Sequence, residues 1–272
     1  MTARAVTLPR GGAALAARQT AALAWRSVLT TVRVPQSWFP ALFFPLVLMA
    51  IFTGSFGQAP GHLPGFPPVR GFLDFAVSGA IFQGVLIGGV TAGAAFALDI
   101  EGGFFDRLVA SPVSRVALLL GRLGGGLALA ILQALLFLAI AVIFGARVEG
   151  GLAGVLVVVL FAAILSLAVG GLGVCLALRT GSSEAVQGMF PLFFALLFFS
   201  SAFFPRETMS GWFRVVADWN PISHLVEGMR AQVISGVEVR VTLVGLGIAV
   251  GLAGLAVGAS AMLLRRRLRE AS

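Results

Sequence analysis

The 272-residue chain is 58% hydrophobic and only 11% charged, and its mean hydropathy is +1.01. One core cannot bury that much apolar surface, so the composition excludes an ordinary soluble domain and predicts a membrane-spanning protein. The formal charge of +8 comes from arginine alone, because the chain has no lysine. A P-loop needs a lysine on the nucleotide phosphates, so any ATP site must belong to another subunit.

Residues 1–36 are expected to form a cytoplasmic N-terminal segment with a helix at the membrane interface. Trp25, Val28, Leu29 and Val32 follow the spacing of one helical face. Arg18 falls on the same face and weakens this pattern. A basic leader without regular structure is the alternative.

Six apolar runs are long enough to cross a bilayer, which takes roughly 20 residues per helix. All are predicted to be helices, since no run alternates as a membrane β-strand does. The predicted spans, within a transmembrane domain of residues 37–267, are 38–57, 75–98, 116–144, 152–178, 185–204 and 241–264. Pro191 and Pro205 bound the phenylalanine-rich core of the fifth run and predict a kinked or short span. Residues 268–272 are expected to form a cytoplasmic tail.

Arginine placement predicts the orientation of these spans. Thirteen of the nineteen arginines lie in the N-terminal segment, in the second and fourth connections and in the tail. Arginine accumulates on the cytoplasmic side of membrane proteins, so both termini are expected there. The same placement, between and beside apolar runs, argues for membrane orientation and against binding of nucleic acid.

The interiors of the predicted spans contain almost no ionisable residues, which argues against a proton-driven or sodium-driven carrier. The single cysteine, Cys175, excludes an intrachain disulfide or a cysteine metal cluster, and no metal site is expected. A substrate path would be lined by aromatic and aliphatic side chains with few polar ones. The candidates are Gln83, Gln133, Phe198, Phe199 and Ser200.

The connection "DIEGGFFDRLVASPVSR", residues 99–115, interrupts the apolar sequence. Phe105, Leu108 and Val109 share a helical face, and Pro112 stops the helix. A short helix of this kind suits docking into a groove of a partner. An ordinary charged cytoplasmic loop is the alternative.

Two motifs resemble those of ABC-2 type transporter permeases, especially the daunorubicin-resistance type. The first is "EGGFFDRLVASPVSRVALLLGR", matched at Glu101, Gly102, Leu108, Ser111, Pro112, Val113 and Arg115. The second is "WNPISHLVEGMRAQVISG", matched at Asn220, Pro221, Ile222, His224, Glu227 and Arg230. The resemblance runs from the first span to the C-terminus.

The resemblance implies that two permease copies, expected as a homodimer, work with two cytosolic ATPase subunits that hold ATP and Mg. This chain itself then binds no cofactor and is not an enzyme. The short cytoplasmic helix would receive the ATPase motion through Glu101, Phe105, Arg107, Leu108, Val109, Pro112 and Arg115. Glu101 and either Arg107 or Arg115 would hold the loop against the N-terminal helix.

Residues 209–234 would form an extracellular re-entrant segment before the last span. Trp212, Val215, Val216 and Trp219 repeat at helical spacing before the Asn220–Pro221 turn. Its key residues are Pro205, Trp212, Trp219, Asn220, Pro221, Glu227 and Arg230. An ordinary surface helix is the alternative.

The expected function is export of a lipophilic drug, antibiotic or lipid-like compound across the bacterial cytoplasmic (inner) membrane. Export of a polysaccharide or lipid-linked glycan is the alternative within transport. A membrane-embedded enzyme is a rival of another class, but no nucleophile–base pair or ligand set lies at membrane depth. A non-transporting assembly or sensor protein would lack the motif at residues 101–115.

Overall fold

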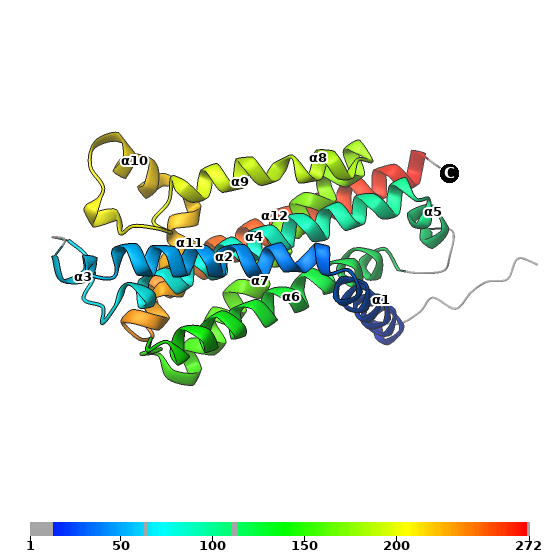
Figure 1. Ribbon diagram of the computed structural model, residues 1–272. Coiled ribbons are helices and arrows are strands. Elements are labelled where there is room, and N and C mark those ends of the chain that lie inside the picture. The colour runs from blue at the N-terminus through cyan, green and yellow to red at the C-terminus, as the bar shows by residue number, and fades with distance from the viewer. Residues whose placement is uncertain (1–12, 63–64, 110–113, 271–272) are drawn as a thin grey trace, which may run out of the picture.

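The computed structural model describes residues 13–62, 65–109 and 114–270, which contain helices and no strand (Figure 1). The helices are α1 Ala13–Arg33, α2 Pro35–Phe56, α3 Ala59–His62, α4 Phe72–Glu101, α5 Phe104–Val109, α6 Arg115–Ile143, α7 Gly151–Thr180, α8 Ser183–Gln187, α9 Met189–Phe198, α10 Gly211–Trp219, α11 Pro221–Ile234 and α12 Val239–Glu270. A 3-10 turn, Arg206–Thr208, precedes α10. The prediction of an all-helical polytopic membrane protein is confirmed.

Five helical stretches in the described residues are long and apolar enough to cross a membrane, namely 35–62, 72–101, 117–143, 151–180 and 239–267. They run along one bundle, with α1, α5 and the C-terminal end of α12 at one end and α3 and α10 at the other (Figure 1). We call these the arginine-rich end and the α10 end. Both termini of the described chain therefore lie at the same end.

The fifth predicted span, residues 185–204, differs from its prediction because it is broken. The chain forms α8 and then α9, and the apolar helical stretch Ser183–Phe198 is shorter than the five long ones. Pro191 has no N–H to donate to the carbonyl of Gln187, which explains the interruption at Gly188. The chain then leaves the helix after Phe198.

Helix α4 lies in the middle of the bundle and is buried along most of its length. It contacts α7 at Gly93 and Gly173, where a Cβ on Gly93 would lie 2.6 Å from the Gly173 Cα. Small residues thus allow two membrane helices to approach closely, as the glycine-rich sequence suggested. This crossing fixes α4 against α7 while α2 and α6 pack on its other sides.

Helix α1 crosses the arginine-rich end at an angle to the long helices (Figure 1). Its small and polar residues pack on α6, where a Cβ on Gly124 would lie 2.6 Å from the Ala24 Cβ. Ser27 Oγ donates to the carbonyl of Arg122 and accepts from the N–H of Gly125. Trp25 and Val32, on the predicted apolar face, remain exposed. The polar face of α1 is therefore turned to protein and the apolar face away from it.

Candidate functional site

The first motif begins where α4 ends, at the arginine-rich end of the bundle. Glu101 Oε1 accepts a 2.6 Å hydrogen bond from the N–H of Ser183, and its Oε2 accepts one of 3.3 Å from the Ser183 hydroxyl. Gly103 turns the chain with φ +66°, a value that glycine adopts without strain. Glu101 therefore joins the end of α4 to the start of α8, directly before the turn into α5.

Phe105 of α5 points into the bundle, which corrects the prediction that it forms part of a docking face. It is 3% exposed, and its ring packs 5.5 Å from the ring of Phe96 on α4. The guanidinium carbon of Arg267 on α12 lies 5.6 Å from the same ring. Phe105 thus anchors α5 to two long helices and is not open to a partner.

The remaining residues of the predicted docking face fall in different places. Arg107 is exposed, and Leu108 is half-buried beside the cleft between α1, α4 and α6. Pro112 and the side chains of Val109 and Arg115 lie outside the described residues. Among the predicted residues of α5 whose side chains the structure describes, Arg107 lies on the outer surface.

The predicted tie from Glu101 and Arg107 or Arg115 to the N-terminal helix is wrong for Glu101, which binds Ser183 instead. The contact between α1 and the α5 segment is made by Arg26, whose guanidinium carbon lies 4.0 Å from the centre of the Phe104 ring. Gln19 adds a hydrogen bond from the N–H of Ser114 to its Oε1. A cation–π contact and a hydrogen bond to an amide oxygen thus hold the loop against the N-terminal helix, the role expected of Glu101 with Arg107 or Arg115.

Asp99 and Arg122 form an ion pair that we did not predict. Arg122 Nε lies 2.6 Å from Asp99 Oδ2, and the side chains are 13% and 16% exposed. Arg122 also donates to the carbonyl of Ala95 at 3.0 Å. Asp99 lies in the last turn of α4 and Arg122 near the start of α6, at one end of two helices that are long and apolar enough to cross a membrane, and an unpaired charge in such a mostly buried position is costly. In the sequence, Asp99 lies one residue beyond the predicted span 75–98 and Arg122 near the start of the span 116–144, and this nearness to the same end of two spans was the signal that could have paired them.

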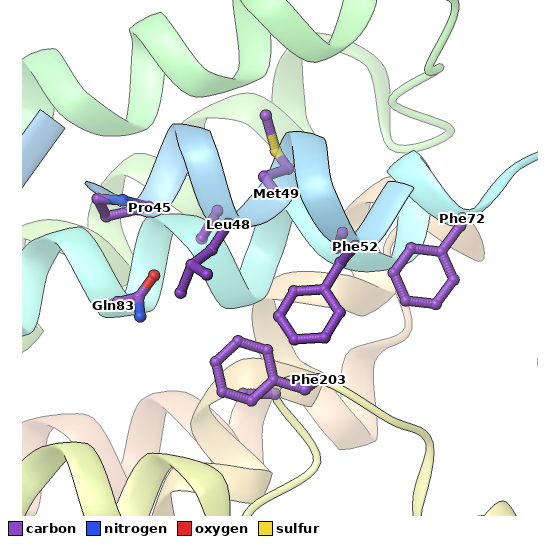
Figure 2. A pocket seen from close by; sticks show the side chains of 10 residues that line it. Pro45, Leu48, Met49, Phe52, Phe72, Gln83 and Phe203 are labelled. Carbon is purple, nitrogen blue, oxygen red and sulfur yellow. The ribbon is translucent and has the colours of Figure 1, made fainter. Parts of the chain in front are cut away.

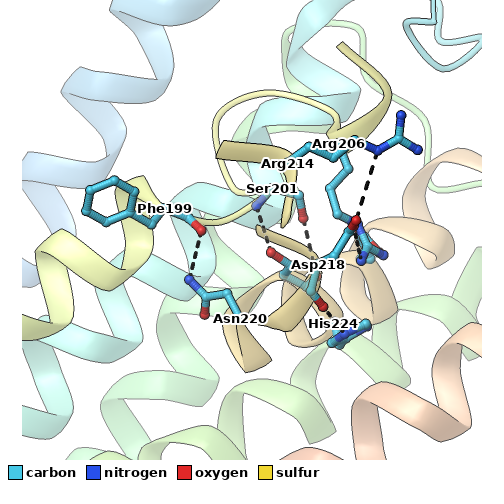
Figure 3. A network of polar contacts seen from close by, with 9 residues as sticks. Phe199, Ser201, Arg206, Arg214, Asp218, Asn220 and His224 are labelled. Atoms are coloured by element: carbon cyan, nitrogen blue, oxygen red, sulfur yellow. Dashed lines mark hydrogen bonds and ion pairs between the residues drawn. The ribbon is translucent and has the colours of Figure 1, made fainter. Parts of the chain in front are cut away.

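The second motif closes the α10 end (Figure 3). Asn220 Nδ2 donates to the carbonyls of Leu196 and Phe199, at 2.7 and 2.9 Å, and its Oδ1 accepts from the N–H of Ile222. One side chain therefore binds the last turn of α9 and caps the start of α11. Pro221 occupies the first position of α11, where a missing N–H costs nothing.

Arg230, predicted in the re-entrant segment, lies inside the protein. It is 5% exposed, and it donates to the carbonyls of Phe75 at 3.2 Å and Ala202 at 3.0 Å. Its guanidinium carbon lies 3.5 Å from the centre of the Phe75 ring. Burial lowers the pKa of Arg230 to about 9, against the opposing effect of Glu227 and Glu207, so the group is charged at neutral pH. Arg230 joins α11, α4 and the chain that follows α9.

A network of charges covers this junction on the outside (Figure 3). Arg206, directly after Pro205, binds both Glu227 and Asp218, and Arg214 lies 4.0 Å from Asp218. The predicted helix with apolar spacing is α10, and its tryptophans, Trp212 and Trp219, are 69% and 85% exposed. An exposed aromatic face beside a charged one is typical of a helix at a membrane interface.

The candidates for the substrate path do not meet in one place. Gln83 lines a small cavity between α2, α4 and the chain at residues 202–203, and its Nε2 has no partner among the described residues (Figure 2). Gln133 is buried and donates to the carbonyl of Ala41. The Ser200 hydroxyl donates to the carbonyl of Leu197, and Phe198 and Phe199 are 46% and 38% exposed.

The cavity at Gln83 has apolar walls, with Phe52 and Phe203 facing each other at 5.1 Å between ring centres (Figure 2). Its volume is about 10 Å³. A single water needs roughly that much space. In this conformation no route for a drug-sized molecule is open here.

Comparison with known proteins decides the family. Residues 18–234 match the family described as ABC-2 type transporter, a range that contains the matched residues of both motifs. The chain belongs to the ABC-2 type transporter family.

The relatives of this ABC-2 permease include proteins named for drug resistance. The daunorubicin resistance ABC transporter permease protein DrrB1 of Streptomyces coeruleorubidus is 28% identical over 207 residues, which are 76% of this chain and 71% of the relative. A putative transport permease, ycf38, of Porphyra purpurea is 27% identical over 211 residues, 77% of this chain and 72% of the relative. The probable doxorubicin resistance ABC transporter permease protein DrrC of Mycobacterium tuberculosis (strain CDC 1551 / Oshkosh) is 26% identical over 157 residues, 56% of this chain and 57% of the relative.

Proposed function

We propose that this ABC-2 permease is the membrane subunit of an ATP-driven exporter in a bacterial cytoplasmic membrane. A separate ATPase hydrolyses ATP, since the permease has no lysine for a P-loop. Two ATPases and two permeases form the complete exporter, with a homodimer of this chain as the simplest arrangement. The observation that supports this most directly is the attachment of α5 to the bundle.

Helix α5 has one exposed side and one anchored side. Arg107 is exposed, whereas Phe105 is packed on α4 and α12. Glu101, at the end of α4, binds Ser183 at the start of α8. A push on α5 from the arginine-rich end is therefore transmitted to the apolar helices α4 and α12, and through Glu101 to α8 and the apolar α9 that follows it. We infer that the ATPase makes this push as it binds ATP.

The cargo is proposed to be a lipophilic compound. DrrB1 and DrrC are named for resistance to daunorubicin and doxorubicin. The cavity at Gln83 offers phenylalanine and methionine side chains with one free amide N–H, a chemistry that suits an apolar molecule with a few hydrogen-bond acceptors. It must widen before such a molecule passes, which requires α2 to move relative to α4 and the chain at residues 202–203.

We further infer that α8 and α9 form the sixth span together. Their sixteen residues reach about 24 Å at 1.5 Å per residue, and residues 199–204 complete the crossing of a core about 30 Å thick. The α10 end is then extracellular and the arginine-rich end cytoplasmic.

The orientation is tested by labelling cysteines in a Cys175→Ala background. Ser210 and Ala17 are both exposed, one at each end of the bundle. Ser210→Cys is expected to react with a membrane-impermeant maleimide added to intact cells, and Ala17→Cys only after the cells are permeabilised. Labelling in the reverse order would contradict the orientation.

The transport function is tested in vesicles that contain the permease and its co-purified ATPase. Daunorubicin is the probe, and its fluorescence reports accumulation in inverted vesicles. We expect accumulation that needs ATP and stops with vanadate. ATP-independent accumulation, abolished by a proton uncoupler, would contradict an ABC exporter.

A further inference from the structure

A groove on the outside of the bundle, near the arginine-rich end, is not part of the proposed transport route. It has a volume of about 480 Å³ and lies between α7, α12 and Met189 at the start of α9. The two long helices touch beside it, where the Ser260 hydroxyl donates to the carbonyl of Gly171 at 2.8 Å. The groove therefore follows a fixed helix contact and is not a gap between loose elements.

The two helices present the same pattern to the groove. On each, residues at positions i, i+3, i+4 and i+7 line it, and the last of the four is an arginine. The residues are Leu172, Cys175, Leu176 and Arg179 on α7 and Ala259, Met262, Leu263 and Arg266 on α12. Both helices run toward the arginine-rich end (Figure 1). Because each arginine is the last of its four lining residues, both arginines lie at the same mouth of the groove.

Neither Arg179 nor Arg266 has an ion-pair or hydrogen-bond partner within residues 13–62, 65–109 and 114–270. Both are exposed, as are the apolar side chains of Leu172 (38%) and Met262 (62%). A groove with an apolar floor and two free cations at its interfacial mouth complements a molecule that has a hydrocarbon chain and an anionic head.

We propose that this groove binds one anionic phospholipid from the leaflet at the arginine-rich end. Its phosphate lies between the guanidinium groups of Arg179 and Arg266, and an acyl chain follows the apolar residues of α7 and α12. Arginine suits this role because its planar donors match phosphate oxygens. The bound lipid links α7 and α12 at the end where Arg267 of α12 donates to the carbonyl of Leu178. The proposal goes beyond export and does not depend on it.

A second copy of the chain fits the groove less well. A two-fold contact through this surface would bring two Arg179 and two Arg266 side chains together without an acid among the residues that line it. A cytosolic protein would reach the arginines but not the apolar floor, which belongs to membrane-spanning helices.

The test is native mass spectrometry of the purified full chain with added phosphatidylglycerol or phosphatidylcholine of identical acyl chains. We expect one phosphatidylglycerol to be retained about tenfold more tightly than phosphatidylcholine. Arg179→Gln with Arg266→Gln is expected to remove this preference. Arg33→Gln with Arg265→Gln, which removes two exposed arginines at the same end outside the groove, is the matched control and should behave as wild type.

Met262→Trp tests the apolar half, because it fills the groove and leaves both arginines in place. It should lower phosphatidylglycerol retention severalfold while the helix content by circular dichroism stays unchanged. Equal retention of the two lipids, or wild-type retention by the Arg179→Gln/Arg266→Gln variant, would overturn the proposal. A change of dimerisation in that variant with lipid retention intact would also overturn it, and would assign the groove to a subunit interface.

Discussion

Replacing Arg230 by leucine is expected to lower the free energy of unfolding by about 2–4 kcal/mol and to abolish transport. The guanidinium group donates to the carbonyls of Phe75 and Ala202, and leucine removes both of these buried hydrogen bonds. It also ends the cation–π contact with the Phe75 ring. Unfolding in mixed micelles of increasing denaturing detergent measures the first effect, and vesicle uptake of daunorubicin the second.

Two variants make this result specific. Arg214→Leu, at the same end, removes an arginine whose side chain is 54% exposed and lies 4.0 Å from its acid, so stability should change by less than about 1 kcal/mol. Arg230→Lys keeps the charge but has one nitrogen for two carbonyls, and an intermediate loss is expected. If Arg230→Leu were as stable as Arg214→Leu, the junction of α11 with α4 would not depend on this side chain.

The second large effect is expected at the Asp99–Arg122 pair. Arg122→Met removes the ion-pair partner of the mostly buried Asp99 carboxylate, at a cost of about 3 kcal/mol. Asp99→Asn combined with Arg122→Met removes both charges, so the double variant should recover at least half of that loss. The same unfolding titration of the wild type, the two single variants and the double variant gives the coupling energy.

The exposed pair Arg70–Glu149 is a matched control at the α10 end. Its side chains are 57% and 44% exposed at a separation of 3.3 Å, and Arg70→Met should cost less than about 1 kcal/mol. A strictly additive double variant of Asp99 and Arg122 would show that the two charges do not stabilise each other.

The sequence was sufficient to place the long helices, because a bilayer imposes a length and a polarity that any span must satisfy. The predicted run 152–178 corresponds to α7 at Gly151–Thr180, and the run 75–98 to α4 at Phe72–Glu101. The short helix at Phe104–Val109 and the turn at Asn220–Pro221 were likewise readable, since glycine and proline mark them.

The direction in which individual side chains point could not be predicted from the sequence. Phe105 and Leu108 share a face of α5, but whether that face meets a partner or the bundle depends on Phe96 and Arg267, which are distant in sequence. Similarly, the partner of Glu101 is Ser183, 82 residues further along the chain. A single sequence gives helical faces from its periodicity, but it does not say which element packs on each face.

The break in the fifth predicted span could be predicted from the sequence only in part. Pro191 and Pro205 indicated a kinked or short span, and the interruption at Gly188 follows from the missing N–H of Pro191. The end of α9 at Phe198 is stabilised by a residue that is distant in sequence. Asn220 binds the carbonyls of Leu196 and Phe199 there, a contact that only the folded chain reveals.

The exposed side of α5 is the proposed site at which the ATPase drives the permease, and ATP-dependent daunorubicin uptake by Arg107→Glu measures its contribution. Arg107 is exposed and outside the anchoring contacts of Phe105, so the charge reversal should leave the fold intact. We expect loss of ATPase co-purification and at least a tenfold fall in uptake. Arg240→Glu, an exposed arginine at the α10 end, should retain wild-type uptake. Full ATP-driven uptake by Arg107→Glu would show that the ATPase does not drive the permease through this side of α5.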